Sequence, residues 1–186
     1  MKKLSITFST TVVLMLMLML TGVAFAETKV TFDKFQNITN IKAERTPMSD
    51  VTLGGGESAD PLVTKVDMGV SFSCEGKSDF CRPKSVQLLF VAYTAKWVFG
   101  SQRKIILLID GTPENAGTRS WNGSVIGAHN LVEFVSTSIS PELLAKLALA
   151  KTVDVQIDLF EVSLTDKNLA AIKDIASHMK PSQSKP

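Results

Sequence analysis

Hydrophobic and polar residues alternate along several short stretches of this chain, which is the pattern of β-strands that bury one face. In the clearest stretch, hydrophobic residues occupy every second position, at Val66, Met68, Val70, Phe72 and Cys74. We expect further strands over residues 28–35, 131–139 and 153–159, and a weaker one over 38–44.

Two other stretches, residues 86–93 and 105–109, are hydrophobic on both faces of a strand. Strands of this kind lie in the middle of a sheet, with other elements covering each face. Trp97 follows the first of them and is itself followed by Val98 and Phe99, so we expect its side chain to join the core.

Two helices are predicted late in the chain. Ser-Pro-Glu at residues 140–142 supplies a hydroxyl cap, a proline at the first helical position and an acid in the first turn, so a helix should cover about 141–150. Thr-Asp at residues 165–166 begins a second helix over about 166–179, with its hydrophobic residues on one stripe. Before the first helix, an Asp-Gly turn opens a Gly- and Asn-rich loop over 110–130, with a short strand near Val125.

Several short strands followed by two helices predict a mainly β fold. We expect an antiparallel β-sandwich-like domain with a short helix (about 141–150) and a C-terminal helix (about 166–179); the alternative is a two-layer α+β domain. A chain of this length buries one core, so residues 27–180 should form a single domain followed by a disordered tail at 181–186.

Residues 1–26 have the features of a cleavable signal peptide. Lys2 and Lys3 precede an apolar run from Val12 to Leu20, and Ala24 and Ala26 provide the small residues that signal peptidase requires. The apolar run is well short of the roughly 20 residues that span a bilayer. We therefore expect an exported protein, periplasmic or secreted, that is soluble once the signal is removed.

Loss of this signal would leave the chain formally neutral, with 18 Lys and Arg, since two of 20 lie in the signal, against 18 Asp and Glu. A nucleic-acid binder needs a basic face, so we expect no nucleic-acid partner. No later stretch is apolar enough to span a membrane. The partner is expected to be a protein, a glycan or a small molecule.

Cys74 and Cys81 are the only cysteines. After an export signal, an isolated close pair is more often a disulfide than a metal site, and this one would close the neck of a hairpin between two strands. A redox pair is less consistent with the spacing, because six residues separate the two cysteines rather than two.

Candidate catalytic residues are sparse. His129 and His178 are the only histidines, and His178, near the end of the last helix, suits a surface position. Nothing is spaced to help His129 bind zinc, so we assign no metal, no cofactor and no catalytic residue. The alternative is an exported hydrolase assembled from distant residues, with His129 as base and Asp110 or Glu114 orienting it.

The best remaining candidate is a binding site in the segment that holds Arg119, Trp121, Asn122, His129 and Asn130. Trp121, among Gly and Asn, could present its ring to a sugar, a peptide or another partner. In the competing interpretation, Trp121 folds back over the edge of the core.

The leading hypothesis is an exported, non-catalytic domain that binds a partner or ligand or has a structural role. A pilus subunit, which would use β-strand addition, fits poorly with the helical C-terminus.

Overall fold

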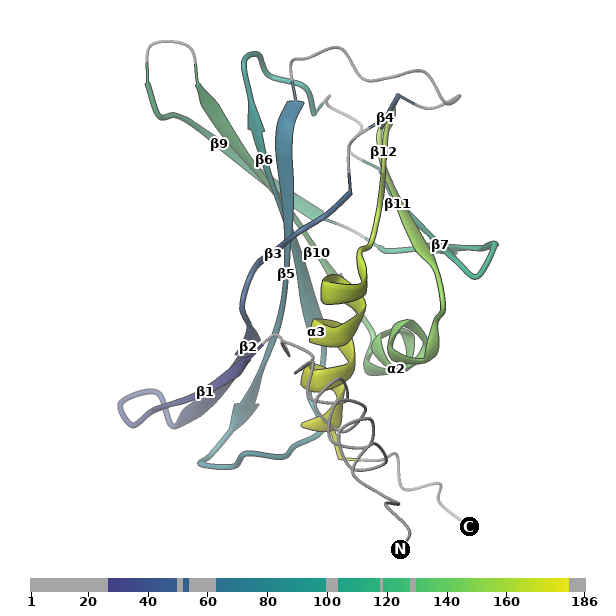
Figure 1. Cartoon of the computed structure of the whole chain (residues 1–186). Helices are drawn as coiled ribbons and strands as arrows, with labels where there is room; N and C mark the ends of the chain where they lie inside the picture. Colours follow the sequence, from purple (N-terminus) through teal and green to yellow (C-terminus); the bar gives the residue numbers. More distant parts are fainter. Residues whose placement is uncertain are drawn as a thin grey trace, which may run out of the picture.

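The computed structural model describes residues 27–49, 52–53, 63–99, 104–117, 119–127 and 130–180, so the predicted signal peptide and tail lie outside the described residues. Its strands form two antiparallel sheets (Figure 1). The large sheet has the order β1-β2-β5-β6-β10-β9, with β3 pairing with β5; its strands are β1 (Thr28–Asp33), β2 (Ile38–Ala43), β3 (Thr46–Pro47), β5 (Val63–Glu75), β6 (Val86–Thr94), β9 (Arg119–Val125) and β10 (Leu131–Ile139). The small sheet has the order β4-β12-β11-β7-β8, with β4 (Thr52–Leu53), β7 (Ile105–Ile109), β8 (Thr112–Asn115), β11 (Val153–Ile157) and β12 (Phe160–Ser163).

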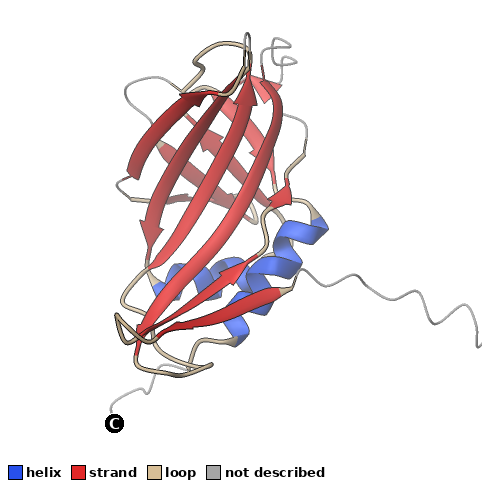
Figure 2. Ribbon diagram, turned by 90° about the vertical axis from the view of Figure 1, so that its left-hand side faces the viewer, coloured by secondary structure: helices blue, strands red, loops and turns tan. Residues whose placement is uncertain are grey.

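Two helices, α2 (Pro141–Leu149) and α3 (Asp166–Ser177), complete the described part of the fold. Figure 2 shows the large sheet in front, the small sheet behind its upper part and the helices behind its lower part. One face of the large sheet is therefore covered by a second layer that is half sheet and half helix. The mainly β, antiparallel prediction with two late helices is confirmed.

The core lies between these two layers. β6 pairs with β5 on one side and β10 on the other. The face of β6 that includes Phe90 is buried along its whole length. On the opposite face Val91 is fully buried, but Leu89 and Tyr93 are only half-buried and Gln87 is exposed, so the expectation of two covered faces is met only in part. β7 differs from the expectation: Ile105, Leu107 and Ile109 are buried, but Leu108 is 37 % exposed. This strand does lie inside a sheet, yet nothing among the described residues covers its outer face.

The structure corrects several predicted boundaries. Residues 119–125 form one continuous strand, where the sequence suggested a loop with a short strand near Val125. The last predicted strand ends at Ile157, because Asp158 adopts a positive φ of 55° and turns the chain into β12, which the sequence analysis missed. β8 was also missed; it follows a tight turn in which Asp110 and Gly111 have φ values of 48° and 81°, as a two-residue hairpin turn of this type requires.

Both helices begin as the sequence predicts. The Ser140 hydroxyl accepts a hydrogen bond from the Leu143 backbone N–H, and Thr165 does the same for Asn168. α2 buries Leu144 and Leu147, and shortening either to alanine should cost about 2–5 kcal/mol. α3 packs against α2 and against β2 and β5, so the last helix closes the core near the strands that begin the chain.

Cys74 and Cys81 form a disulfide across the neck of the β5–β6 hairpin, with Cα atoms 6.3 Å apart. The loop they close is also bound to the end of α3. The Cys81 N–H donates to the His178 carbonyl (3.1 Å), and the Lys180 N–H donates to the Cys81 carbonyl (2.8 Å). The hairpin and the C-terminal helix are thus held together at one point.

Candidate binding edge at strand β9

The predicted site residues lie on the hairpin formed by β9 and β10. Arg119, Trp121 and Asn122 belong to β9 itself, and Asn130 precedes β10, where its carbonyl accepts a hydrogen bond from the Ile126 N–H. His129 lies outside the described residues, as does the side chain of Arg119. The predicted loop is therefore mostly an edge strand of the large sheet, seen at the left of Figure 1.

Trp121 faces the space between the layers, where it meets a buried acid. Its indole N–H donates to Oε1 of Glu133 at 3.0 Å, and the backbone N–H groups of Val98 and Phe99 donate to the same carboxylate at 2.8 and 3.3 Å. Glu133 is fully buried on β10, so this set of three donors satisfies a group that would otherwise be costly to bury. These three hydrogen bonds hold the segment after β6, at Val98 and Phe99, against the β9–β10 hairpin. Glu133 was not among the residues expected to form a site.

Trp97, expected in the core, is 50 % exposed, while its neighbour Phe99 is buried. The Trp97 ring meets the Trp121 ring edge-on, with centroids 5.7 Å apart. It also lies against Gly123: a Cβ atom on that residue would overlap Cζ3 of Trp97 and lie 2.8 Å from Cη2. Trp97 is thus the more exposed of the two indoles, and Trp121 packs against the core and supports it.

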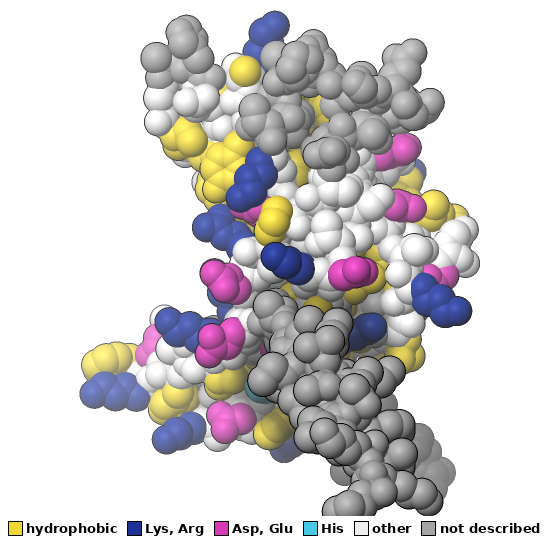
Figure 3. Space-filling view, viewed as in Figure 1, with side chains coloured by type: hydrophobic (Ala, Val, Ile, Leu, Met, Phe, Trp, Pro, Cys, Tyr) yellow, Lys and Arg dark blue, Asp and Glu magenta, His cyan; other side chains and the backbone are white. Residues whose placement is uncertain are grey.

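The backbone of β9 is paired on one side only. Its seven residues match β10 without a register shift, and in the described part of the chain no strand lies on the other side. Exposed hydrophobic side chains flank this strand: Trp97 beside Gly123, and Val125 and Ile126 at its end, with 68 % and 55 % exposure. We call the unpaired side of β9, together with these three side chains, the β9 edge. Hydrophobic side chains gather on this side of the molecule in Figure 3.

The other described strands that are paired on one side only carry features that discourage pairing with a second chain; one of them, β3, is two residues long and contains Pro47. β1 has the charged residues Lys29 and Asp33, β8 has Pro113 and Glu114 within only four residues, and β4 is two residues long. Charges, prolines and short length are the usual protections of an exposed strand. Beyond Arg119 at its start, β9 has neither a charge nor a proline.

One local feature of β9 does occupy an edge group. The Oδ1 atom of Asn122 accepts a hydrogen bond from the N–H of Gly123 at 2.8 Å, at the centre of the strand. The Asn122 side chain is exposed, so it can turn into water and give up this bond when another acceptor approaches.

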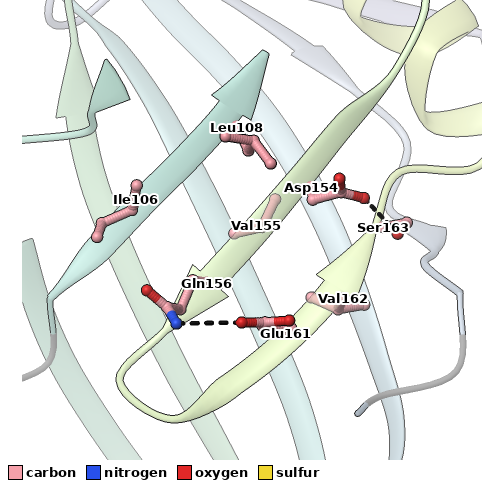
Figure 4. A pocket seen from close by; sticks show the side chains of 8 residues that line it. All are labelled: Ile106, Leu108, Asp154, Val155, Gln156, Glu161, Val162 and Ser163. Carbon is pink, nitrogen blue, oxygen red and sulfur yellow. Dashed lines mark hydrogen bonds between the residues drawn. The ribbon is translucent and has the colours of Figure 1, made fainter. Parts of the chain in front are cut away.

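A second surface feature is a shallow trough of about 420 Å³ on the outer face of the small sheet (Figure 4). Ile106 and Leu108 of β7 form its hydrophobic side. Two polar pairs face them: Ser163 donates to Asp154 at 2.5 Å, and Gln156 donates to Glu161 at 3.2 Å. The acids of this trough already have partners on neighbouring strands.

The residues proposed to assist His129 in a hydrolase have other roles in the structure. The Asp110 carboxylate accepts hydrogen bonds from the N–H groups of Thr152 and Lys151, both at 2.9 Å, and these bonds lower the pKa of Asp110 below its ordinary value of 3.8. Glu114 forms an ion pair with Lys146. Asp110 therefore joins the β7–β8 turn to the start of β11, and Glu114 joins β8 to α2.

His178 lies at the end of α3, where the sequence predicted it. Its ring stacks on Phe80 with centroids 5.5 Å apart, and its Nδ1 atom is 2.9 Å from the Asp79 carbonyl oxygen. This histidine therefore holds the disulfide loop against the helix. Across the described residues, no three His, Cys, Asp or Glu side chains gather in a group that could hold a metal ion.

No helix in the described part of the chain has the length and apolar character that crossing a membrane requires. Comparisons with protein-family models, with curated proteins and with solved structures found no match to this chain.

Proposed function

We propose that this protein is an exported, non-catalytic binding domain that takes up an extended segment of a protein partner at the β9 edge. The partner strand would hydrogen-bond to the free side of β9 and extend the large sheet. The observation that carries the proposal is the contrast between edges: β9 is long and lacks internal charges and prolines, whereas β1, β4 and β8 are charged or short.

Strand addition combines main-chain hydrogen bonds, which give affinity, with side-chain contacts at alternate positions, which give specificity. At the β9 edge the side-chain contacts would come from Trp97, Val125 and Ile126, which are exposed beside the strand. Trp97 is well suited to this role, because Trp121 and Gly123 fix its ring before any partner arrives.

Export is supported by the signal-like sequence at residues 1–26 and by the Cys74–Cys81 disulfide, a bond that persists in oxidising compartments. Expression in a bacterial host that exports through the general secretion route tests this directly. The intact mass of the purified protein should correspond to a chain that begins at Glu27, two hydrogens lighter than the reduced form. A full-length mass would contradict cleavage.

Binding is tested by selecting random nine-residue peptides displayed on phage against the purified exported protein. Selected peptides, made synthetically, should slow hydrogen–deuterium exchange of the amides in residues 119–125 and leave β1 unchanged. Trp97→Ala should weaken their binding about tenfold, because a buried aromatic anchor is typically worth more than about 1.4 kcal/mol. Leu149→Ala, which removes a hydrophobic side chain that is 84 % exposed on α2, is the matched control and should have no effect. Protection of β7, β11 or β12 instead of β9 would move the site to the trough and refute the proposal.

A further inference from the structure

The sequence of β9 is compatible with pairing to itself. When two copies of Arg119–Val125 are laid antiparallel about a two-fold axis at Asn122, Ser120 faces Ser124 of the other copy, and Trp121 faces Gly123. Arg119 faces Val125, so no two like charges oppose one another. On the basis of the function proposed above, we infer that the partner strand is β9 of a second copy of this chain, joined in this register.

The side-chain sizes favour this register over its neighbours. Directly opposed residues in an antiparallel pair have Cβ atoms about 5 Å apart, so the bulk of facing side chains decides whether they fit. With the axis at Asn122, the largest side chain of the strand, Trp121, meets Gly123, so its direct neighbour in the second copy is the Trp97 ring that lies on that glycine. With the axis at Trp121, two indoles would face each other in the same layer.

The hydrogen-bonding groups and the net charge agree with this arrangement. Two facing serines can share a hydrogen bond across the strands, as Ser120 already does with Ser136 of β10 at 2.7 Å. After loss of the signal the chain would carry 18 basic and 18 acidic residues, so two copies would not repel one another through net charge.

The surroundings of the strand add hydrophobic contact. Trp97, lying on Gly123, would come beside Trp121 of the second copy, and Val125 and Ile126 would approach the start of the opposite β9. A pair of seven-residue strands with these flanking side chains buries less surface than a standard interface of about 1,600 Å², so we expect a reversible dimer with a Kd of about 10 µM. Such a dimer has a two-fold axis and closes, because each copy uses its only unprotected described edge.

The test is sedimentation equilibrium of the exported protein, purified with its disulfide intact, over a concentration range that brackets about 10 µM. The chain should pass from monomer to dimer. Ser120→Lys combined with Ser124→Lys places lysine opposite lysine at two positions, and should weaken the dimer about tenfold or more. Ser120→Lys combined with Ser124→Glu places lysine opposite glutamate and should restore or strengthen it. Thr31→Lys on the exposed face of β1 is the control and should leave the dimer unchanged.

Asn122→Ala gives a prediction of opposite sign. It removes the side chain that occupies the Gly123 N–H, and the dimer should become tighter. A protein that stays monomeric throughout the range, or a dimer that responds alike to the Lys/Lys and Lys/Glu pairs, would overturn the inference. The two proposals fail separately: if the chain is monomeric but displayed peptides still protect residues 119–125, only the second copy is wrong as partner, and if the peptides fail as well, strand addition at β9 is wrong.

Discussion

Replacing Gly123 with alanine tests how much the packing of the Trp97 indole against this residue contributes to the free energy of unfolding. The new Cβ atom would overlap Cζ3 of Trp97 and lie 3.1 Å from Cζ2 of Trp121. Trp97 is half exposed and can swing outward, whereas Trp121 is held by its hydrogen bond to Glu133. We therefore expect the Trp97 ring to move away from residue 123 into solvent.

The cost follows from the surface that Trp97 buries. A tryptophan that is 50 % exposed keeps about 100 Å² covered, which at about 25 cal/mol per Å² is worth about 2.5 kcal/mol. Alanine is better than glycine in a strand by about 0.5 kcal/mol, because the unfolded chain loses less freedom. The net loss in the free energy of unfolding should be about 2 kcal/mol.

Urea unfolding, followed by far-ultraviolet circular dichroism, measures this loss, and tryptophan fluorescence should shift to longer wavelength as Trp97 enters water. Gly127→Ala is the matched control in the same hairpin. Among the described residues its Cβ would meet only the Asn130 side chain, at 3.7 Å, so the change in stability should stay within about 0.5 kcal/mol. In a Trp97→Ala background, Gly123→Ala should cost much less, because only the 3.1 Å approach to Cζ2 of Trp121 remains. An equal cost with and without Trp97 would refute the reasoning.

Three further predictions concern the disulfide, the buried acid and the β7–β8 turn. Changing both Cys74 and Cys81 to serine should lower the free energy of unfolding by about 2.5 kcal/mol, measured by urea unfolding, because the short closed loop restricts the unfolded chain; the same loss on adding reductant to the unaltered protein is the check. Glu133→Gln should lower the free energy of unfolding by about 1.5–3 kcal/mol, because the amide NH₂ group would face N–H donors whose hydrogen bonds the carboxylate oxygen accepted. An unchanged midpoint in thermal or urea unfolding would contradict a role of these hydrogen bonds in stability. The pKa of Asp110 is lower in the folded chain than in the unfolded one, so its contribution to stability is present above pH 3.8 and is lost as the pH falls below it. Asp110→Asn should therefore make the free energy of unfolding fall less steeply below about pH 4. If the free energy of unfolding falls equally steeply below about pH 4 in the variant, the carboxylate is not responsible.

Elements whose structure depends on neighbouring residues could be predicted from the sequence. Residues 131–139 form β10 with the predicted bounds, because their apolar positions lie on a strand that is paired on both sides. α2 begins at Pro141 because Ser140 caps it, and this needs only three consecutive residues. The predictions failed where a distant partner decides. β9 is rich in Gly, Asn and Ser and is a strand because β10 supplies its hydrogen bonds.

The candidate site shows the same division. Trp121 was identified as a notable residue from its polar neighbourhood, but the sequence gives no indication that Trp97, far away in the chain, lies against it. The apolar residues next to Trp97 led us to expect a buried side chain, but Trp97 is half exposed. Phe99, two residues on, takes the buried position, and Glu133 accepts hydrogen bonds from the backbone N–H groups of Val98 and Phe99. Glu133, an acid between Val132 and Phe134 in the apolar first half of β10, is a local signal that could have pointed to this cluster.

The packing of α3 determines when this chain can finish folding. The last helix covers β2 and β5, and the Cys81–Lys180 hydrogen bond ties its end to the hairpin near the middle of the chain. A growing chain that lacks residues 166–180 leaves those strands uncovered, so its core stays incomplete until the last helix has been made. If the chain is exported as proposed, the late arrival of α3 would delay completion of the core and so favour the extended form that a narrow secretion channel requires.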